Sequence, residues 1–226
     1  MYELALFAGV GGGLLGTHSL GIRCVCAVEA RPFAAGVLAQ RQNDGCLDPF
    51  PIWDDVHTFD GRPWRGIVNF VSGGFPCQPF SNASRGRRVA KDLWPEMLRV
   101  VREVESQYVF AENVSRAAIE QAANDCASMG YKTEMLSLSA KDLGADHVRC
   151  RYWLLAYSND KSQLRSHINA KMASGAGFHE SIWEAKPRES GMDDGLAVRL
   201  ERYTSVGNGQ VAVVAAAALW ALANAD

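Results

Sequence analysis

The chain has 226 residues, of which 48% are hydrophobic, so it is long and apolar enough to build one large domain with a real core. Its formal net charge of -2 excludes a uniformly basic nucleic-acid-binding protein, and any such partner must meet a local basic patch. The 6 cysteines show no Cys-x-x-Cys spacing, so we expect neither a zinc site nor a disulfide framework, and we expect a reducing, cytoplasmic location.

Strands and helices are predicted to alternate along residues 3–158. Short apolar runs that end in glycine or acidic residues predict strands, and apolar residues three or four apart predict helices. The predicted strands are residues 3–7, 24–29, 67–72, 108–114, 131–140 and 151–158. The predicted helices are residues 12–20, 32–42, 92–106 and 119–131. This alternation predicts an α/β fold with a mostly parallel sheet covered by helices on both faces.

The last part of the chain breaks this pattern. From residue 159 to about 188 the sequence is polar with scattered Gly, Ser and Asn, which predicts an irregular insert or small subdomain, with disorder as the alternative. The apolar run at 211–225 is shorter than the roughly 20 residues that span a bilayer, so we expect a buried terminal helix. The start of the chain lacks a basic region and reaches glycine too early for a signal peptide.

The stretch LFAGVGGG predicts a tight turn from strand to helix, because Gly9, Gly11 and Gly12 follow the first predicted strand. Glycines there let a nucleotide-like cofactor approach the backbone closely. Glu29 ends the next predicted strand, where an acid commonly hydrogen-bonds ribose hydroxyls. An ordinary strand–helix turn without a ligand stays open as the alternative.

Two further stretches give weaker signals. In IWDDVHTFD, either Asp54 or Asp55 could accept a hydrogen bond from an adenine amino group, and an ordinary surface acid is the alternative. In SNASRGRRVAKD, a glycine-containing loop carries cations that suit phosphate contacts, namely Arg85, Arg87, Arg88 and Lys91. A solvated loop without a partner is the alternative there.

Cys77 lies in the stretch GGFPCQPFS, crowded by glycine and proline. A structural cysteine normally lies on an apolar face of a strand or helix, whereas Cys77 follows Pro76 at the carboxyl end of a predicted parallel strand. Ligands bind at that edge of open α/β sheets. A free thiol has a pKa of about 8.5 and is strongly nucleophilic even when only a few per cent is thiolate. These features predict a covalent nucleophile.

Glu112 ends another predicted strand, in FAENV, and is expected at the same edge of the sheet as Cys77. Arg149 and Arg151, in HVRCRYW, are two residues apart and would share one face of a strand. A carboxyl group and two guanidinium groups beside a thiol predict a site for a polar heterocycle. A structural Arg–Glu salt bridge is the alternative.

Taken in order, these motifs resemble those of the cytosine-C5 DNA methyltransferases over nearly the whole chain. LFAGVGG is similar to the family's first cofactor motif, DDV to its adenine-edge motif, and GGFPCQPFS to its Pro-Cys nucleophile motif, the most specific of the set. ENV resembles the base-recognition motif, HVRCR the Gln-x-Arg-x-Arg motif, and VGNGQV the final motif, which packs against the cofactor site. The resemblance implies a Rossmann-like methyltransferase fold. It implies a catalytic and cofactor-binding domain at 1–157, a very short target-recognition region at 158–199, and a segment at 200–226 that packs back on the catalytic domain.

The resemblance also implies the site residues. The implied ligands of S-adenosyl-L-methionine are Phe7, Ala8, Gly9, Gly11, Gly12, Glu29, Asp55, Val56, Gly74, Pro76, Leu93 and Asn208. The implied DNA contacts are Ser81, Arg85, Arg87, Arg88 and Lys91. Departures from the family pattern are His147 in place of glutamine and an arginine-bearing motif reduced to GMDDGLAVRLERY. The compact layout resembles small methyltransferases of phages and prophages, so we expect a monomer that acts on double-stranded DNA in a bacterial or phage-infected cell without a metal.

The mechanism that the resemblance implies begins with attack of Cys77 on C6 of cytosine. Glu112, kept protonated by burial, acts at the ring N3, while Arg151 holds O2 with support from Arg149. C5 then takes the methyl group, leaving S-adenosyl-L-homocysteine, and loss of the C5 proton releases Cys77. The attack needs the ring face, so the cytosine must flip out of the duplex, with loop 81–91 expected to close over it and Phe7 to pack against the adenosyl group.

Three other functions stay open. An RNA cytosine-C5 methyltransferase is the nearest, although the chain lacks both the Cys-Phe-Thr signature of the tRNA-methylating branch and the Thr-Cys motif of the separate RNA enzymes. A nucleotide-binding oxidoreductase would explain GVGGG and Glu29 but not Cys77, Glu112 or the paired arginines. A non-catalytic DNA-binding relative would keep the fold, but the intact Pro76-Cys77 pair argues against it.

Overall fold

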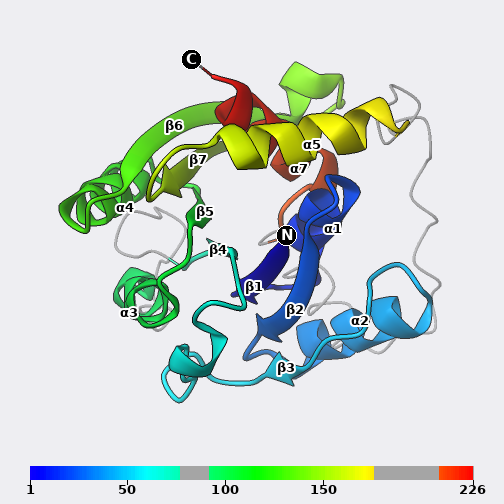
Figure 1. Cartoon of the computed structure of the whole chain (residues 1–226). Helices are drawn as coiled ribbons and strands as arrows, with labels where there is room; N and C mark the ends of the chain where they lie inside the picture. The colour runs from blue at the N-terminus through cyan, green and yellow to red at the C-terminus, as the bar shows by residue number, and fades with distance from the viewer. Residues whose placement is uncertain (77–91, 176–208, 226) are drawn as a thin grey trace, which may run out of the picture.

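The computed structural model describes residues 1–76, 92–175 and 209–225 of the chain. Within these ranges, seven strands form one sheet in the order β3-β2-β1-β4-β5-β7-β6 (Figure 1). The strands are β1 (Tyr2–Leu6), β2 (Arg23–Val28), β3 (Ile52–Trp53), β4 (Phe70–Gly74), β5 (Tyr108–Asn113), β6 (Lys132–Ser139) and β7 (Cys150–Tyr157). The helices are α1 (Gly12–Ser19), α2 (Pro32–Asn43), α3 (Trp94–Val104), α4 (Arg116–Ser128), α5 (Ser162–Ala173) and α7 (Ala212–Asn224), with short 3-10 turns η1 (Arg62–Trp64) and η2 (Ala140–Leu143).

The sheet is mostly parallel, as the alternation of elements predicts. Strands β3, β2, β1, β4 and β5 run parallel to one another, whereas β7 lies antiparallel between β5 and β6. A parallel sheet is covered on both faces, so its strands are apolar in both directions rather than alternating. Strand β5 shows this plainly, because all of its residues are buried.

Alternate residues of β1 divide the core between the two faces of the sheet. Leu4 and Leu6 pack with buried residues of α3 and α4. Ala5 points the opposite way and packs with α1 and α2. Phe70 pairs with Glu3 of β1 and so shares the face of Ala5, where it packs with α5 and α7. The molecule is therefore a three-layer helix–sheet–helix arrangement (Figure 1).

The strand predicted at residues 67–72 begins later, at Phe70. Gly66 adopts a φ of 76°, and the amide of Ile67 donates a hydrogen bond to the carbonyl of Trp64. The side chain of Ile67 is 52% exposed. A turn closed by Gly66 therefore replaces the first part of the expected strand, although Ile67 and its neighbours have the composition of one.

The irregular region predicted from residue 159 to about 188 is wrong for Ser162–Ala173, which form α5. Leu164 and Ile168, one turn apart, are fully buried in the core cluster that includes α7. Arg165 extends the contact by donating to the carbonyl of Ala223 on α7 at 2.9 Å. This docking stabilises a helix whose own apolar pattern is sparse, as tertiary packing commonly does. Residues 176–188 lie outside the described ranges.

The buried terminal helix that the apolar run predicts is confirmed as α7. It packs against α1, and the two helices approach closely at Gly16, where a Cβ atom would come within 2.6 Å of the carbonyl oxygen of Ala212. Across the described ranges, no helix has the length and apolarity needed to cross a membrane.

Candidate active site

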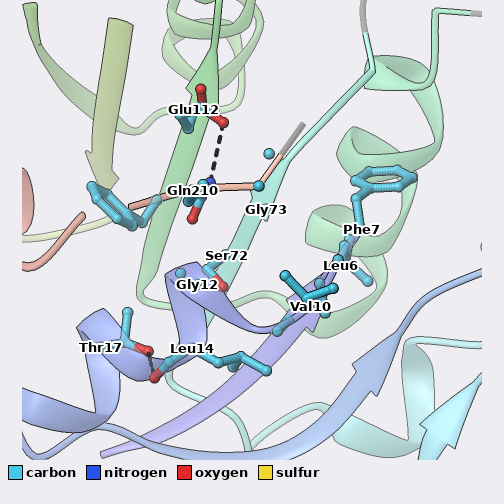
Figure 2. A pocket seen from close by; sticks show the side chains of 17 residues that line it. Leu6, Phe7, Val10, Gly12, Leu14, Thr17, Ser72, Gly73, Glu112 and Gln210 are labelled. Atoms are coloured by element: carbon cyan, nitrogen blue, oxygen red, sulfur yellow. Dashed lines mark hydrogen bonds between the residues drawn. The ribbon is translucent and has the colours of Figure 1, made fainter. Parts of the chain in front are cut away.

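A pocket opens at the carboxyl ends of β1 and β4, the edge where parallel α/β sheets bind ligands (Figure 2). The turn between β1 and α1 forms one wall, and the end of β4 forms another. Phe7, Glu112 and Gln210 contribute side chains from the end of β1, from β5 and from the segment before α7. The pocket therefore gathers groups from both ends of the chain and from its middle.

Positive backbone angles shape the turn after β1. Phe7, Gly9 and Gly11 have φ values of 53°, 56° and 85°. Nothing lies within 4 Å of the place where a Cβ of Gly9 would stand, so this glycine leaves open space. Bulky residues rarely adopt such angles, and Phe7, which lines the pocket, also packs against the buried core.

Gly12 and Gly13 begin α1 and lie directly against the segment that precedes α7. A Cβ at Gly12 would come within 1.9 Å of the carbonyl oxygen of Gln210, and a Cβ at Gly13 within 2.1 Å of its Oε1. Gly12 was expected to make room for a cofactor. The structure shows a second requirement for glycine at this position, because Gln210 lies so close to the start of α1 that a side chain at Gly12 would collide with it.

Glu29 follows β2 and ties the glycine turn to its neighbour strand. Its buried carboxylate accepts hydrogen bonds from the backbone N–H of Gly9 at 2.7 Å and of Arg31 at 2.9 Å. The Arg31 side chain adds an ion pair at 3.3 Å. Glu29, the acid expected near the ribose, thus lies directly after β2. Its hydrogen bond with Gly9 also fixes the turn that shapes the pocket.

The acids of the IWDDV stretch lie in the loop after β3. The side chain of Asp55 is about half exposed and accepts hydrogen bonds from the backbone N–H of His57 at 2.9 Å and from its ring at 2.8 Å. The backbone hydrogen bond of His57, followed by its side-chain bond, lowers the pKa of Asp55. Val56 beside it is buried against the core.

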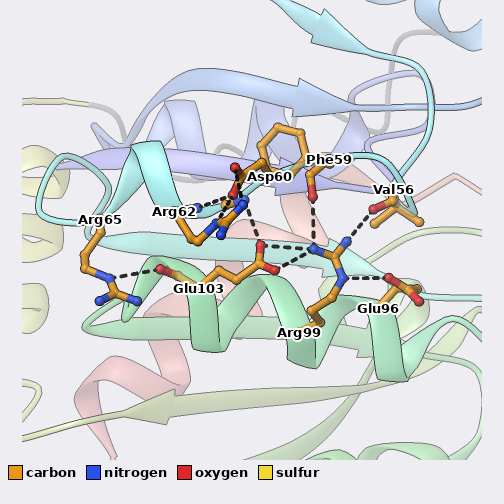
Figure 3. A network of polar contacts seen from close by, with 9 residues as sticks. Val56, Phe59, Asp60, Arg62, Arg65, Glu96, Arg99 and Glu103 are labelled. Atoms are coloured by element: carbon orange, nitrogen blue, oxygen red, sulfur yellow. Dashed lines mark hydrogen bonds and ion pairs between the residues drawn. The ribbon is translucent and has the colours of Figure 1, made fainter.

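A single guanidinium on α3 holds this loop in place (Figure 3). Arg99 donates to the carbonyls of Val56 at 2.6 Å and Phe59 at 3.0 Å. The same group is paired with Glu96 and Glu103, each at 2.8 Å. Arg99 was not expected at the site from the sequence, because its carbonyl partners lie some 40 residues away along the chain.

Glu112 is the buried carboxyl of the pocket. Arg151 of β7 lies 3.0 Å from its Oε1, and Gln210 donates to its Oε2 at 3.2 Å. Burial raises the pKa of Glu112, while the hydrogen bond from Gln210 and the charges of Arg151 and Arg149 act to lower it. Arg149 precedes β7 and donates to the carbonyl of Gly209 at 2.6 Å, so it also binds the final segment.

Several expected site residues fall outside the described ranges. These are Cys77, the loop residues Ser81, Arg85, Arg87, Arg88 and Lys91, and Asn208 of the final motif. The described residues that flank the loop are close together, because the amide of Leu93 donates to the carbonyl of Pro76 at 3.1 Å. Gly74 ends β4 just before them and lines the pocket.

Besides Arg99, two residues with polar contacts at the site were not predicted from the sequence. Asn113 donates from Nδ2 to the carbonyl of Phe75 at 2.9 Å, which fixes the chain beyond β4. Gln210 bonds Glu112 and covers α1. Both lie inside motifs quoted in the sequence analysis, ENV and VGNGQV, which did not name them as site residues.

Residues 1–190 match the family described as C-5 cytosine-specific DNA methylase. The chain belongs to this family. Type II methyltransferase M.NgoMIV of Neisseria gonorrhoeae is 31% identical over 167 residues, which cover 70% of this chain and 52% of that protein. Type II methyltransferase M.Eco47II of Escherichia coli is also 31% identical, over 70% of this chain and 39% of its own. The methylase chain thus spans about half the length of these relatives, or less.

Solved structures agree with this fold. A protein described as a DNA modification methyltransferase encoded within a prophage of E. coli is 26% identical with a TM-score of 0.54, and the match covers 70% of this chain and 46% of that one. The S. pombe Dnmt2 methyltransferase, at 22% identity and a TM-score of 0.55 over 70% of this chain and 51% of its own, shares the fold. In the described part of the methylase chain, no cluster of His, Cys, Asp and Glu suits a metal ion.

Proposed function

We propose that this chain transfers a methyl group from S-adenosyl-L-methionine to C5 of a cytosine in double-stranded DNA. The proposal is carried by the buried Glu112 and its partly buried partner Arg151, 3.0 Å apart, beside a glycine-walled pocket in a member of the cytosine-specific family. A carboxyl and a guanidinium held together at the end of parallel strands offer a donor and acceptor set for the edge of a pyrimidine.

The residues around the pocket suit S-adenosyl-L-methionine in kind. Gly9 leaves open space, and the ring of Phe7 offers apolar surface for an adenosyl group. Glu29 and Asp55 follow β2 and β3, where they would meet ribose hydroxyls and an adenine amino group. When bound, this cofactor supplies an electrophilic methyl group on a sulfonium and leaves as S-adenosyl-L-homocysteine. The remaining proposed contacts are Ala8, Gly11, Gly12, Val56, Gly74, Pro76, Leu93 and Asn208.

In the proposed reaction, Sγ of Cys77 bonds to C6 of the cytosine, and the electrons of the C5–C6 double bond move to C5, which takes the methyl group. Glu112 assists at N3, because burial raises its pKa and lets it hold a proton nearer neutral pH than an exposed carboxyl does. Arg151 would hold O2, with Arg149 beside it. Loss of the C5 proton then restores the double bond as the Sγ–C6 bond breaks.

A stacked cytosine hides its ring face, so the base must flip out at a cost of a few kcal/mol. The described residues that flank 77–91 are joined by the hydrogen bond from Leu93 to Pro76, and Pro76 lies two residues beyond Gly74, which lines the pocket. We propose that the cations of residues 77–91 contact DNA phosphates there. Residues 158–199 remain our proposed target-recognition region, of which α5 packs on α7.

Labelled methyl transfer from S-adenosyl-L-methionine to duplex DNA tests the proposal. Cys77→Ser is expected to reduce transfer below detection, because a serine hydroxyl is a far weaker nucleophile than a thiolate. The matched control is Cys46→Ser, at an exposed free cysteine, which should leave the rate unchanged. Undiminished transfer by Cys77→Ser would refute the covalent route. If the protein methylates RNA of the same sequence but not the DNA, the substrate is RNA rather than DNA.

A further inference from the structure

The carboxamide of Gln210 lies between the start of α1, the end of β4 and the carboxyl of Glu112 (Figure 2). We propose that Gln210 is a positioning residue that sets the orientation and proton affinity of Glu112, an inference that rests on the proposed function of this site. Gln210 acts through Glu112 and is not expected to touch the cytosine itself.

Two donors from different elements hold the two carboxyl oxygens of Glu112. Nε2 of Gln210 donates to Oε2 at 3.2 Å, and Nε of Arg151 lies 3.0 Å from Oε1. With one donor the carboxyl could still turn about its last bond, but two donors on opposite oxygens define its plane. That plane decides which atom of a flipped base Glu112 can reach.

Glycines on both sides make this contact possible. A Cβ at Gly74 would come within 2.7 Å of Oε2 of Glu112 and 2.9 Å of Nε2 of Gln210. A Cβ at Gly13 would come within 2.1 Å of Oε1 of Gln210. The Gln210 side chain is thus clamped between α1 and β4, so its amide has little freedom to leave Glu112.

The groups around Glu112 determine in which direction its pKa changes when the donor of Gln210 is removed. Among the described residues, the charged groups that face it are Arg151 and Arg149 at the β7 side, while β4 presents Gly73 and Gly74. The hydrogen bond from Gln210 stabilises the ionised carboxyl and opposes the effect of burial. Removing that donor must therefore raise the pKa of Glu112 further.

Two variants separate this role from simple packing. Gln210→Met keeps the length and most of the volume but has no donor, and Gln210→Glu keeps the shape but places a second carboxyl beside Glu112. Gln121→Met is the matched control, because Gln121 is exposed on α4 and donates to Asp125 on the same helix at 3.0 Å rather than to Glu112. A role limited to packing predicts that Gln210→Met behaves as the wild type.

The first measurement is the pH dependence of methyl transfer at saturating cofactor. For Gln210→Met we expect kcat near neutral pH to fall roughly tenfold as the carboxyl loses its orientation. We expect the alkaline limb to move up by about half to one pH unit, and further for Gln210→Glu because like charges repel. The cofactor Kd should stay within about threefold of the wild type, since the acceptor and donor groups proposed to bind it are unchanged.

The second measurement needs no activity. The carboxyl ¹³C resonance of Glu112, assigned by its loss in Glu112→Gln, is titrated by NMR in the wild type and in each variant. A higher midpoint in both Gln210 variants but not in Gln121→Met supports the inference, and equal midpoints in all of them overturn it. A wild type that transfers no methyl group would defeat the proposed function, and the titration would still decide the role of Gln210.

Discussion

Glu3 is a fully buried carboxyl on β1, and the described part of the chain places hydroxyl groups rather than a cation beside it. Thr17 donates to its Oε2 at 2.5 Å, and Ser72 donates to its Oε1. Both hydroxyl residues also line the pocket, so Glu3 joins α1 and β4 beneath it. Burial, opposed by the hydrogen bonds from Ser72 and Thr17, raises the pKa of Glu3 to about 7 from its ordinary 4.5.

The shifted pKa of Glu3 should therefore contribute to the pH dependence of stability. Between pH 4.5 and about 7 the folded state binds the proton more tightly than the unfolded state, so the free energy of unfolding falls as pH rises. The full decrease is of the order of 3 kcal/mol and is complete above pH 7. Glu3→Gln should remove it, leaving the variant more stable than the wild type at pH 8 and not at pH 5.

Urea unfolding at several pH values measures this difference. In the Glu3→Gln variant the new side-chain amide can donate to Thr17, whose hydroxyl then turns to the carbonyl of Leu14, 3.1 Å away. Glu120→Gln, at a partly exposed glutamate on α4, is the control and should follow the wild-type curve. Parallel curves for Glu3→Gln and the wild type would show that Glu3 stays ionised in the fold, contrary to this account.

At the scale of elements, α3 positions the loop that follows β3. Arg99 binds the carbonyls of Val56 and Phe59 with two nitrogens of one planar fork (Figure 3). Lysine cannot reproduce that geometry, so Arg99→Lys should destabilise the fold by about 1–3 kcal/mol and loosen Asp55. We expect the Kd for S-adenosyl-L-methionine to rise about tenfold, measured by calorimetry together with thermal unfolding.

Arg102→Lys is the matched control for this prediction, since Arg102 is exposed on the same helix. It should change neither the Kd nor the stability. If Arg99→Lys lowers stability while the Kd is unchanged, the network supports the fold but does not position a cofactor loop.

Elements with their own apolar signal were predictable, and contacts between distant segments were not. Apolar runs that end in glycine or an acidic residue predict β1 and β2. The carboxyl ends of the predicted strands then indicate the edge of the sheet where Glu29 and Glu112 lie. α5 was missed because Leu164 and Ile168 are its only fully buried residues and α7 completes their packing. Gln210 was missed because its partner stands 98 residues away, a distance that no local pattern encodes.

At the scale of the whole molecule, the net charge of -2 gives DNA no general attraction. The proposed binding to DNA must then depend on a local group of cations, and Arg87 and Arg88 are the central pair of the loop that we propose for it. Replacing both by alanine should weaken binding to duplex DNA at low salt. The plot of log affinity against log salt should become shallower by about 0.9 for each phosphate that the variant no longer neutralises.

Fluorescence anisotropy of a labelled duplex over a range of salt concentrations measures this slope. The matched control replaces Arg23 and Lys132 by alanine, which removes the same charge. These exposed residues begin β2 and β6, at the edge of the sheet opposite the pocket. Long-range attraction depends on the total charge, so it would weaken both double variants alike, whereas direct contact weakens only the Arg87 and Arg88 pair. Equal slopes for the two double variants would therefore show that this loop does not make the DNA contact.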